Sequence, residues 1–571
     1  MGKPCFATRR AHLAAVKLVA IFLSLVSPAV THAARRPSTA DTVRLLRQST
    51  FGPTQALIDH VQQVGFNQFL NEQFAAPVTP YPALEFWPST RPDICTDSCA
   101  RDNYTYYQIQ RHFFVNALTG LDQLRQRVAF VLSQILVTSG SDVPLPVWMR
   151  AYQQLVYQGA FGNFRQLLYD ITLNPTMGRF LDMVNNRCQT RTPPDVNICR
   201  NGSPFLPNEN YAREALQLFS VGTYLLNLDG TVKVDAHGNP IFTYNQQTIT
   251  EFARVFTGWI LAPDLPGPAA IGGTVPNYRD SMVVRVDSQG RESTHDRGAK
   301  TLLNGFQIPA GLPAAQELGM AIENIAFHPN VAPFISRQLI QHLVTSNPSP
   351  GYVKRVAAVF KNNADSPNHL QHVVRAILLD KEARTAPTSR RAPDFGKLNE
   401  PILFMTNLMR AFNATSDGIL NSLTIGGSPI GASAMSQDLF RAPSVFSYYP
   451  PDYEVPGETG LYGPAFGIFS SRTALSRANF AHRVVFSSIP AAPPDRPTGT
   501  SIDLSPWTPL AAAPANLVAQ LDCLMLTCSM STAMQTAIVN AVSSIAASDP
   551  LLRIRTAIYL IATSSQYSVQ R

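Results

Sequence analysis

Carboxylate and guanidinium side chains stand beside an apolar face in the stretch 208–222, N-E-N-Y-A-R-E-A-L-Q-L-F-S-V-G. The charged residues are Glu209, Arg213 and Glu214. Glu209 and Arg213 are four residues apart, a spacing at which a helix can close a local ion pair. Glu214 then remains available for proton transfer or for an ion pair with a neighbouring helix.

A second stretch, 248–259, repeats this arrangement in the sequence T-I-T-E-F-A-R-V-F-T-G-W. Glu251 and Arg254 are three residues apart and can also pair within a helix. Glu214 is expected to reach across to Arg254 and clamp the two helices together. The pattern permits two interpretations, a salt-bridge network that fixes two core helices or an active or metal site.

A third polar group lies on a predicted loop, in the sequence H-D-R-G-A-K that contains His295, Asp296 and Lys300. These side chains can bind an oxyanion or relay a proton, but they can equally stabilise the loop by hydrogen bonds. If the protein is an enzyme, its candidate catalytic residues are Glu209, Arg213, Glu214, Glu251, Arg254, His295, Asp296 and Lys300.

Apolar residues recur at three- and four-residue steps through most of the chain, which predicts amphipathic helices. Two turn signals, Asp229-Gly230 and His237-Gly238, predict a β-hairpin between the two charged stretches. We therefore expect a mainly α protein, a large multi-helix body with a small β-hairpin insertion and long proline-rich loops. The expected helices include 38–53, 55–64, 66–74, 103–119, 121–137, 147–157, 164–170, 176–182, 313–326, 329–344, 352–361, 368–379, 395–412, 474–486, 515–530, 534–546 and 551–563.

The composition of the 571 residues is 45% hydrophobic and 15% charged, with 45 prolines. A single large domain over 34–571 is expected, with a substructure of amino-terminal helices (34–184), a central region (185–310) and carboxy-terminal helices (311–571). Four of the net +8 charges lie in the first 33 residues, leaving +4. This small excess, without a basic stripe, does not predict binding to nucleic acid.

The first 33 residues have the pattern of a signal peptide. Arg9 and Arg10 precede a short apolar core, and Thr31-His32-Ala33 offers small residues for cleavage. Both Sec export and twin-arginine export are compatible with this pattern. We expect a periplasmic or secreted protein, with no transmembrane segment after cleavage.

Six cysteines follow this segment in three close pairs, an arrangement that favours three short-loop disulfides in an oxidising compartment. Zinc is the alternative, but its usual C-x-x-C spacing is missing. The pairs are Cys95/Cys99, Cys188/Cys199 and Cys523/Cys528.

An aromatic segment, P-S-V-F-S-Y-Y-P-P-D-Y at 443–453, can line a sugar or peptide groove, or can be a rigid loop buried against the body. His342 and His372 lie in predicted helices without a histidine or carboxylate four residues away, and they are not predicted as ligands. The sequence has no G-x-S-x-G, H-E-x-x-H, P-loop or G-x-G-x-x-G motif, which disfavours standard serine hydrolases, zincins and nucleotide-binding proteins.

Several motifs in order resemble the bacterial domain of unknown function (DUF) 1800 family. They are R-L-L-R-Q-S-T-F-G-P, N-E-N-Y-A-R-E, T-G-W, H-D-R-G-A-K, F-H-P, P-S-V-F-S-Y-Y-P-P-D-Y and S-S-Q-Y-S-V-Q-R. The resemblance covers nearly the whole chain after residue 33. It implies a large, secreted, mostly helical protein, often encoded beside a sulfatase-like partner, but it implies no activity.

Two residues depart from the family pattern. Gln217 stands where an acid is expected, and Ala465 follows Pro464 where a glutamate is expected. Both changes remove a group that could act as a ligand or as an acid or base. We therefore expect an exported envelope or secreted protein that acts with a partner and whose Glu/Arg network is structural. The alternative is a hydrolase or metal-assisted enzyme that uses the candidate residues, and neither a metal nor a cofactor can be identified from the sequence.

Overall fold

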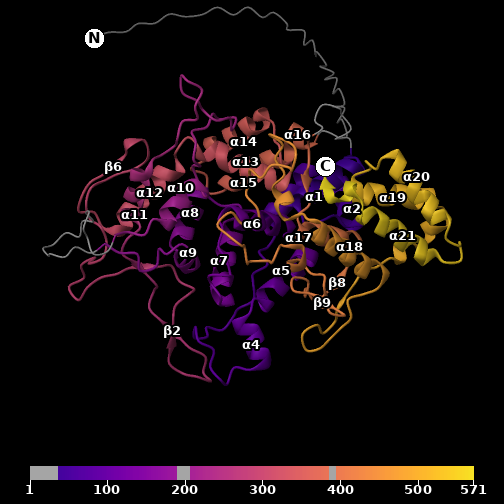
Figure 1. Ribbon diagram of the computed structural model, residues 1–571, viewed down its shortest axis with the longest axis horizontal. Helices are drawn as coiled ribbons and strands as arrows, with labels where there is room; N and C mark the ends of the chain where they lie inside the picture. Colours follow the sequence, from indigo (N-terminus) through magenta and orange to yellow (C-terminus); the bar gives the residue numbers. More distant parts are fainter. Residues whose placement is uncertain (1–35, 189–205, 385–393) are drawn as a thin grey trace, which may run out of the picture. The chain divides into compact units, whose positions relative to one another are not determined.

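In the computed structural model, residues 36–188, 206–384 and 394–571 are described, and they form a mainly α structure. Figure 1 colours the helices by their position in the sequence, and the carboxy-terminal helices (yellow) lie beside the first amino-terminal helices (indigo). Residues 37–571 form one compact unit.

The amino-terminal helices are α1 (Thr39–Ser49), α2 (Gln55–Val64), α3 (Phe66–Ala75), α4 (Asp97–Tyr104), α5 (Tyr107–Thr119), α6 (Gln123–Ile135), α7 (Pro146–Gly159), α8 (Phe164–Thr172) and α9 (Pro175–Phe180). The central helices are α10 (Asn210–Gln217), α11 (Gln246–Val255), α12 (Ala314–Ala326), α13 (Val331–Leu343), α14 (Pro350–Asn362), α15 (His369–Leu379) and α16 (Lys381–Arg384). The carboxy-terminal helices are α17 (Pro401–Ala411), α18 (Ser471–Phe486), α19 (Pro514–Leu526), α20 (Thr532–Ser543), α21 (Pro550–Ala562) and α22 (Ser565–Ser568). Short 3₁₀ helices occupy Leu303–Gly305, Ser433–Met435, Pro464–Ile468 and Ser505–Ala512.

The strands are two residues long and pair antiparallel. They pair as β1 (Trp259–Ile260) with β4 (Val283–Val284), β2 (Leu265–Pro266) with β3 (Thr274–Val275), β5 (Lys300–Thr301) with β6 (Gln307–Ile308), β7 (Lys397–Leu398) with β12 (Val569–Gln570), β8 (Thr415–Ser416) with β11 (Thr500–Ser501), and β9 (Thr424–Ile425) with β10 (Ser428–Pro429). The β7–β12 pair brings the end of the chain against the segment before α17, with Gln570 opposite Lys397.

The predicted helices are confirmed, most of them with shifted ends, and the larger differences have local causes. The predicted helix 395–412 begins at Pro401, because proline is favoured in the first turn but breaks a helix interior. The predicted 208–222 helix ends at Gln217, and Gly222 follows with φ of +72°. α4 begins at Asp97, before the first residue of the predicted helix 103–119, so sequence reasoning missed its start.

The predicted β-hairpin is only partly right. Both predicted turns are present, at Gly230 and Gly238, which have φ of +79° and +85°. The segment 223–244 is nevertheless joined by single bridges rather than by two paired strands. These bridges are Tyr224 with Phe242, Leu226 with Val232, and Val234 with Pro240. We call 223–244 the bridged segment.

Buried arginines hold separate parts of the chain together. Arg410 on α17 donates from Nε to the Gly52 carbonyl at 2.7 Å and from Nη1 to the Leu118 carbonyl at 2.6 Å. Arg47 on α1 donates to the Met525 carbonyl at 3.0 Å. Guanidinium groups therefore satisfy carbonyls that would otherwise be buried without partners.

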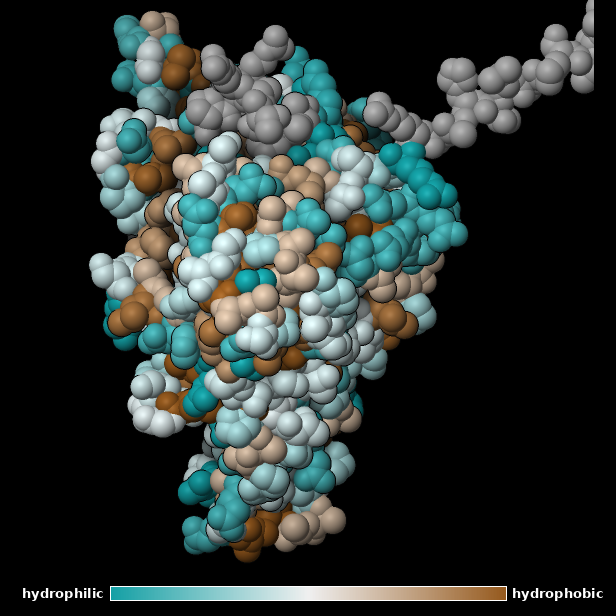
Figure 2. All heavy atoms as spheres, turned by 90° about the vertical axis from the view of Figure 1, so that its right-hand side faces the viewer, coloured by the Kyte–Doolittle hydropathy of each residue, from teal (hydrophilic) through white to brown (hydrophobic). Residues whose placement is uncertain are grey.

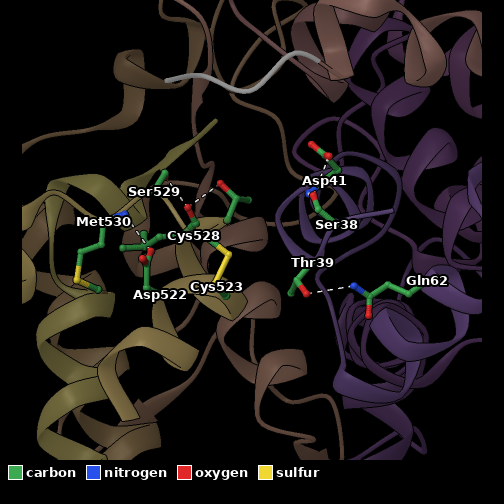
Figure 3. The surroundings of a disulfide bond; sticks show 11 residues. Ser38, Thr39, Asp41, Gln62, Asp522, Cys523, Cys528, Ser529 and Met530 are labelled. Carbon is green, nitrogen blue, oxygen red and sulfur yellow. Dashed lines mark hydrogen bonds between the residues drawn. A yellow bond between two sulfur atoms is a disulfide. The ribbon is translucent and has the colours of Figure 1, made fainter. Parts of the chain in front are cut away.

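Two predicted disulfides, Cys95–Cys99 and Cys523–Cys528, are confirmed, whereas Cys199 of the third lies outside the described residues. Figure 3 shows Cys523–Cys528 at the end of α19, where Asp522 accepts a hydrogen bond of 2.9 Å from the Met530 amide. This bridge therefore closes the turn between α19 and α20.

The start of α1 is capped by Ser38. The Ser38 side chain accepts a hydrogen bond from the Asp41 amide and donates one of 2.8 Å to the Asp41 carboxylate. The cap thus satisfies an amide that has no partner within the first helical turn.

Candidate functional site

The centre of the predicted site is an ion pair between α11 and the loop before β5. Arg254 donates to Asp296 from Nε and Nη2, at 3.0 Å each, and also contacts Glu251 at 2.5 Å. The Asp296 side chain is 0% exposed. Burial lowers the pKa of Arg254, but the hydrogen bonds and charges of Asp296 and Glu251 outweigh it and raise the pKa.

Lys300 on β5 adds a second buried ion pair. Its Nζ lies 2.6 Å from Oε2 of Glu317 and donates to the carbonyls of Asp296 and Gly298 at 2.6 and 2.9 Å. Burial lowers the pKa of Lys300, and the charges of Glu317 and Asp296 oppose this effect. The lysine side chain, with an exposure of 0%, is thus enclosed by acceptors.

His295 completes this cluster. Its Nε2 lies 3.2 Å from Oε2 of Glu317, and its Nδ1 lies 2.9 Å from the Thr257 carbonyl. The hydroxyl of Thr257 accepts a hydrogen bond of 2.9 Å from the Asp296 amide. Gly258 has φ of +91°, and a Cβ there would lie 2.9 Å from that of His295. The threonine and glycine of the T-G-W motif therefore hold the adjacent histidine and aspartate of the H-D-R-G-A-K motif in place.

Glu317 was missed by sequence reasoning. It lies in the first turn of α12, is fully buried and shares the buried face with Ala314, Leu318 and Ala321. A carboxylate at a core position of an amphipathic helix is the signal that could have revealed it, because such a group needs a buried partner.

The side chains of this cluster are closed and mutually paired. We call Glu251, Arg254, His295, Asp296, Lys300 and Glu317 the charged cluster; it joins α11, α12 and β5. Its three carboxylates face an arginine, a lysine and a histidine, and the side chains of four members are 0% exposed. This arrangement suits a structural clamp better than a substrate site, since a substrate must reach its catalytic groups.

The other predicted residues form a separate group. The Glu209–Arg213 pair is confirmed at 3.0 Å, and Glu209 also accepts from Gln246 at 2.7 Å and from Thr250 at 2.8 Å. These contacts tie the start of α10 to α11. The expected clamp from Glu214 to Arg254 is not among the described contacts, because Arg254 is bound by Glu251 and Asp296.

The Glu214 side chain is half-buried, and its carboxyl group has no hydrogen bond or ion pair to any described residue. Burial raises the pKa of its carboxyl group, and the neighbouring charge of Arg213 partly offsets this effect. Such a carboxyl group can exchange a proton more readily near neutral pH than an ordinary glutamate.

A second buried charged group lies at the start of α17 and was also missed. Glu400 accepts hydrogen bonds from Gln437 at 2.5 Å and from the hydroxyl of Tyr449 at 3.0 Å. Burial raises its pKa, but the charges of Lys397 and Arg127 outweigh this and lower it. The signal in the sequence was K-L-N-E-P, where two charges precede a predominantly buried helix.

Lys397 opens onto a small cavity of about 20 Å³ beside His342 and Ala465. No described residue pairs with its ammonium group, and burial lowers its pKa to about 7. Burial likewise lowers the pKa of His342 to about 4, so this histidine is neutral at physiological pH. We call Lys397, Glu400, Arg127, His342 and Tyr449 the lysine cluster.

A larger cavity of about 390 Å³ adjoins the lysine cluster. We call it the groove; it lies between the end of α10, the bridged segment, α13 and the aromatic segment. Gln341 and Pro451 line both the groove and the small cavity. Gln217, one departure from the family pattern, lines the groove, while Ala465, the other, lines the small cavity. Neither therefore belongs to the charged cluster.

The aromatic segment shows both of the expected behaviours. Tyr448 and Tyr449 are buried, and the hydroxyl of Tyr448 donates to the Asp438 carbonyl at 2.7 Å. Phe446 is 44% exposed and lines the groove. Two tyrosines of the segment are therefore buried against the body, whereas the Phe446 ring lies on the surface of the groove.

Across the described ranges, no set of three or more histidine, cysteine, aspartate or glutamate side chains is arranged to hold a metal ion. Within the same ranges, no helix has the length and apolar character needed to cross a bilayer.

The comparisons with known proteins identify a family without a described activity. A family model described as "Protein of unknown function (DUF1800)" matches residues 44–569. Neither a curated protein nor a solved structure matches the chain.

Proposed function

The chain belongs to the DUF1800 family, and we propose that it is an exported protein that acts by binding a second exported protein through the groove. Export is supported by the signal-peptide pattern of residues 1–33 and by the two disulfides. The charged cluster is then a structural element.

The observation that carries this proposal is the apolar surface around the groove. Tyr224, Val232 and Phe446 line it and are 38%, 41% and 44% exposed. Phe242 stacks obliquely on Tyr224 at 5.1 Å between ring centroids and is itself exposed. Apolar side chains gathered around a depression are typical of protein-binding sites.

Charged residues at the groove complete the pattern of an interface. Arg337 and Asp452 both line it, and the guanidinium of Arg337 lies 5.1 Å from the ring centroid of Tyr462. An apolar centre with a polar rim, including arginine and tyrosine, is the usual composition of a transient interface. By contrast, Figure 2 shows hydrophobic residues dispersed among hydrophilic ones on the face of the carboxy-terminal helices.

The occupant we propose is an apolar segment of a partner protein. The family resemblance makes a sulfatase-like protein encoded beside this chain the first partner to test. Its binding to the purified protein, expressed without residues 1–33, can be measured by isothermal titration calorimetry. Val232→Asp and Phe446→Asp place a carboxylate in the groove and should weaken binding at least tenfold, because the charge would have to be buried.

Val286→Asp is the matched control, since Val286 is an exposed valine outside the groove. It should bind as the unsubstituted protein does, and all three variants should keep the same melting temperature. Unchanged affinity in both groove variants would refute the groove as the binding site. Retention of residues 1–33 on protein recovered from the periplasm or medium would refute the signal-peptide assignment.

A second candidate function, a hydrolase, is favoured by one observation, the raised pKa of the partly exposed Glu214. If its carboxyl group is a general acid or base, Glu214→Gln should abolish turnover and leave the melting temperature unchanged. A panel of ester, phosphate-ester and sulfate-ester substrates would test this. Turnover that survives in Glu214→Gln would exclude the role.

A further inference from the structure

Another cavity, which shares no lining residue with the groove, is lined by arginines. It has a volume of about 530 Å³, which is within the range of small-molecule sites. We call it the arginine pocket; its walls are the region from the end of α4 into α5, the segment 418–424, the turn 438–441 and the segment 492–496. Its charged lining residues are Arg101, Arg111, Arg441, Arg496, Asp438 and Asp495.

One arginine of the pocket is already neutralised. Arg101 binds Asp102 from Nε at 2.7 Å and from Nη2 at 3.0 Å, and it also contacts Asp495. Asp438 accepts hydrogen bonds from the neutral amides of Asn421 and Gln110, at 2.8 and 3.3 Å. Among the described residues, no arginine side chain forms an ion pair with the Asp438 carboxylate.

The remaining three arginines keep donors free. Arg111 uses Nε for the Asp417 carbonyl at 2.9 Å, and no described residue binds its terminal nitrogens. The Nε of Arg496 is buried without a hydrogen-bond partner. In the described part of the chain, neither of these arginines nor Arg441 lies within ion-pair distance of a carboxylate. The pocket therefore carries more positive than negative charge, and its unpaired donors suit an anion.

The wall that presents Arg441 is fixed in advance. The guanidinium lies 5.6 Å from the ring centroid of Tyr106, whose hydroxyl donates to the Val143 carbonyl. Phe440, directly before Arg441, has φ of +65°, which is rare for a bulky residue. Its carbonyl accepts a hydrogen bond of 2.8 Å from the Gly140 amide. Unfavourable backbone conformations of this kind cluster at ligand sites.

Gly140 is needed for this wall. A Cβ at residue 140 would lie 2.2 Å from Cε2 of Tyr106, so only glycine allows the tyrosine ring to lie there. The Arg441 guanidinium in turn lies over this ring. A preorganised arginine loses little conformational entropy when it binds a ligand.

We propose that the arginine pocket binds a small organic anion that carries two or more phosphate, sulfate or carboxylate groups. Arginine forms two parallel hydrogen bonds to such groups, and three arginines with free donors can hold at least two of them. The limited volume favours a small molecule over a polymer. Arg111 and Arg441 are the principal binding residues.

Calorimetric titration of the full protein after signal removal, at low ionic strength, tests this proposal. The probes are pyrophosphate, glucose 6-phosphate, glucose 6-sulfate and citrate, which distinguish phosphate, sulfate and carboxylate chemistry. At least one probe should bind saturably at one site. Arg441→Gln and Arg111→Gln should each weaken that binding at least tenfold. Arg472→Gln, at an exposed arginine outside the pocket, should leave it unchanged.

Circular dichroism checks that each variant is folded, and Arg441 is suited to substitution because it is exposed. If a probe binds, its protection against thermal unfolding should disappear in the two pocket variants and persist in Arg472→Gln. Failure of all four probes to bind at millimolar concentration would overturn the proposal. Binding that the pocket variants retain in full would do the same. Neither result bears on the groove, which shares no lining residue with the pocket.

Discussion

Arg254 and Asp296 are joined by two hydrogen bonds of 3.0 Å that run from one guanidinium to both oxygens of one carboxylate. The Asp296 side chain is fully buried. Arg254 lies on α11, forty-two residues earlier in the chain. The geometry depends on the planar fork of arginine, which a lysine cannot reproduce.

Arg254→Lys should therefore destabilise the fold although it keeps the charge. We expect the free energy of unfolding to fall by about 1.5–3 kcal/mol, the usual contribution of a hydrogen bond to a charged group. Arg213→Lys is the matched control, because the pair of Arg213 with Glu209 is partly exposed and is expected to contribute about 0–1 kcal/mol. Guanidinium chloride unfolding measures both, and equal losses would contradict the interpretation of the charged cluster as a buried clamp.

The Lys300–Glu317 pair gives a second test of the charged cluster, in which a single and a double variant are compared by their free energy of unfolding. Lys300→Met leaves the Glu317 carboxylate buried without its cation and should lower the free energy of unfolding by about 3–5 kcal/mol. The double variant Lys300→Met, Glu317→Leu removes both charges, so most of that loss should be recovered. A double-mutant cycle from denaturant unfolding measures the coupling. Additive losses, with no coupling between the two residues, would show that the pair is not a closed unit.

Much of the fold could be predicted from the sequence, because apolar spacing and helix caps are local signals. The range predicted for α2 agrees with the structure at both ends, and Ser38, the first residue of the predicted helix 38–53, caps α1. The site was harder, since its contacts join residues that are distant in sequence. Both local pairs were correct, whereas the cross-helix clamp from Glu214 was not found, because Asp296 and Glu317 supply the tertiary partners that a helix pattern does not specify.

The motifs of the family resemblance were easier to detect than to interpret. The terminal S-V-Q-R forms β12 and pairs with β7, and the side-chain amide of Asn399 donates a hydrogen bond of 3.0 Å to the Tyr567 carbonyl. Similarly, the F-G-P motif near residue 52 packs against α17. Each of these motifs thus contacts a segment that is distant in sequence, which the sequence pattern alone did not show.

Gly52 supplies a prediction about this packing. Its φ is +137°, and a Cβ there would lie 2.7 Å from the Cα of Asn407 on α17. Gly52→Ala should therefore cost the strain of the backbone conformation and about 1–3 kcal/mol more for overpacking. Gly65→Ala is the control, because Gly65 also has a positive φ, +81°, but no atom lies within 4 Å of the added Cβ. Chemical denaturation of the two variants should separate the cost of backbone strain from the cost of overpacking. Equal losses in the free energy of unfolding would mean that α17 can shift to accept the methyl group.

Lys397 predicts how stability depends on pH. Burial, aided by the charge of Arg127 and opposed by that of Glu400, lowers its pKa from 10.5 to about 7. Between these values the unfolded chain binds one more proton than the folded protein, so the free energy of unfolding should rise with pH, by at most about 1.4 kcal/mol per unit. Below pH 7 the lysine is protonated in both states, and the folded protein bears the full cost of a buried charge.

Lys397→Met removes this titration. Urea unfolding at pH 7 and pH 9 should therefore show an increase in the free energy of unfolding that is about 1–2 kcal/mol larger for the unsubstituted protein than for the variant. Both pH values lie below the ordinary tyrosine pKa, which keeps the tyrosines out of the comparison. Identical pH dependence in the two proteins would mean that Lys397 is charged in the fold and has a partner that its surroundings do not reveal.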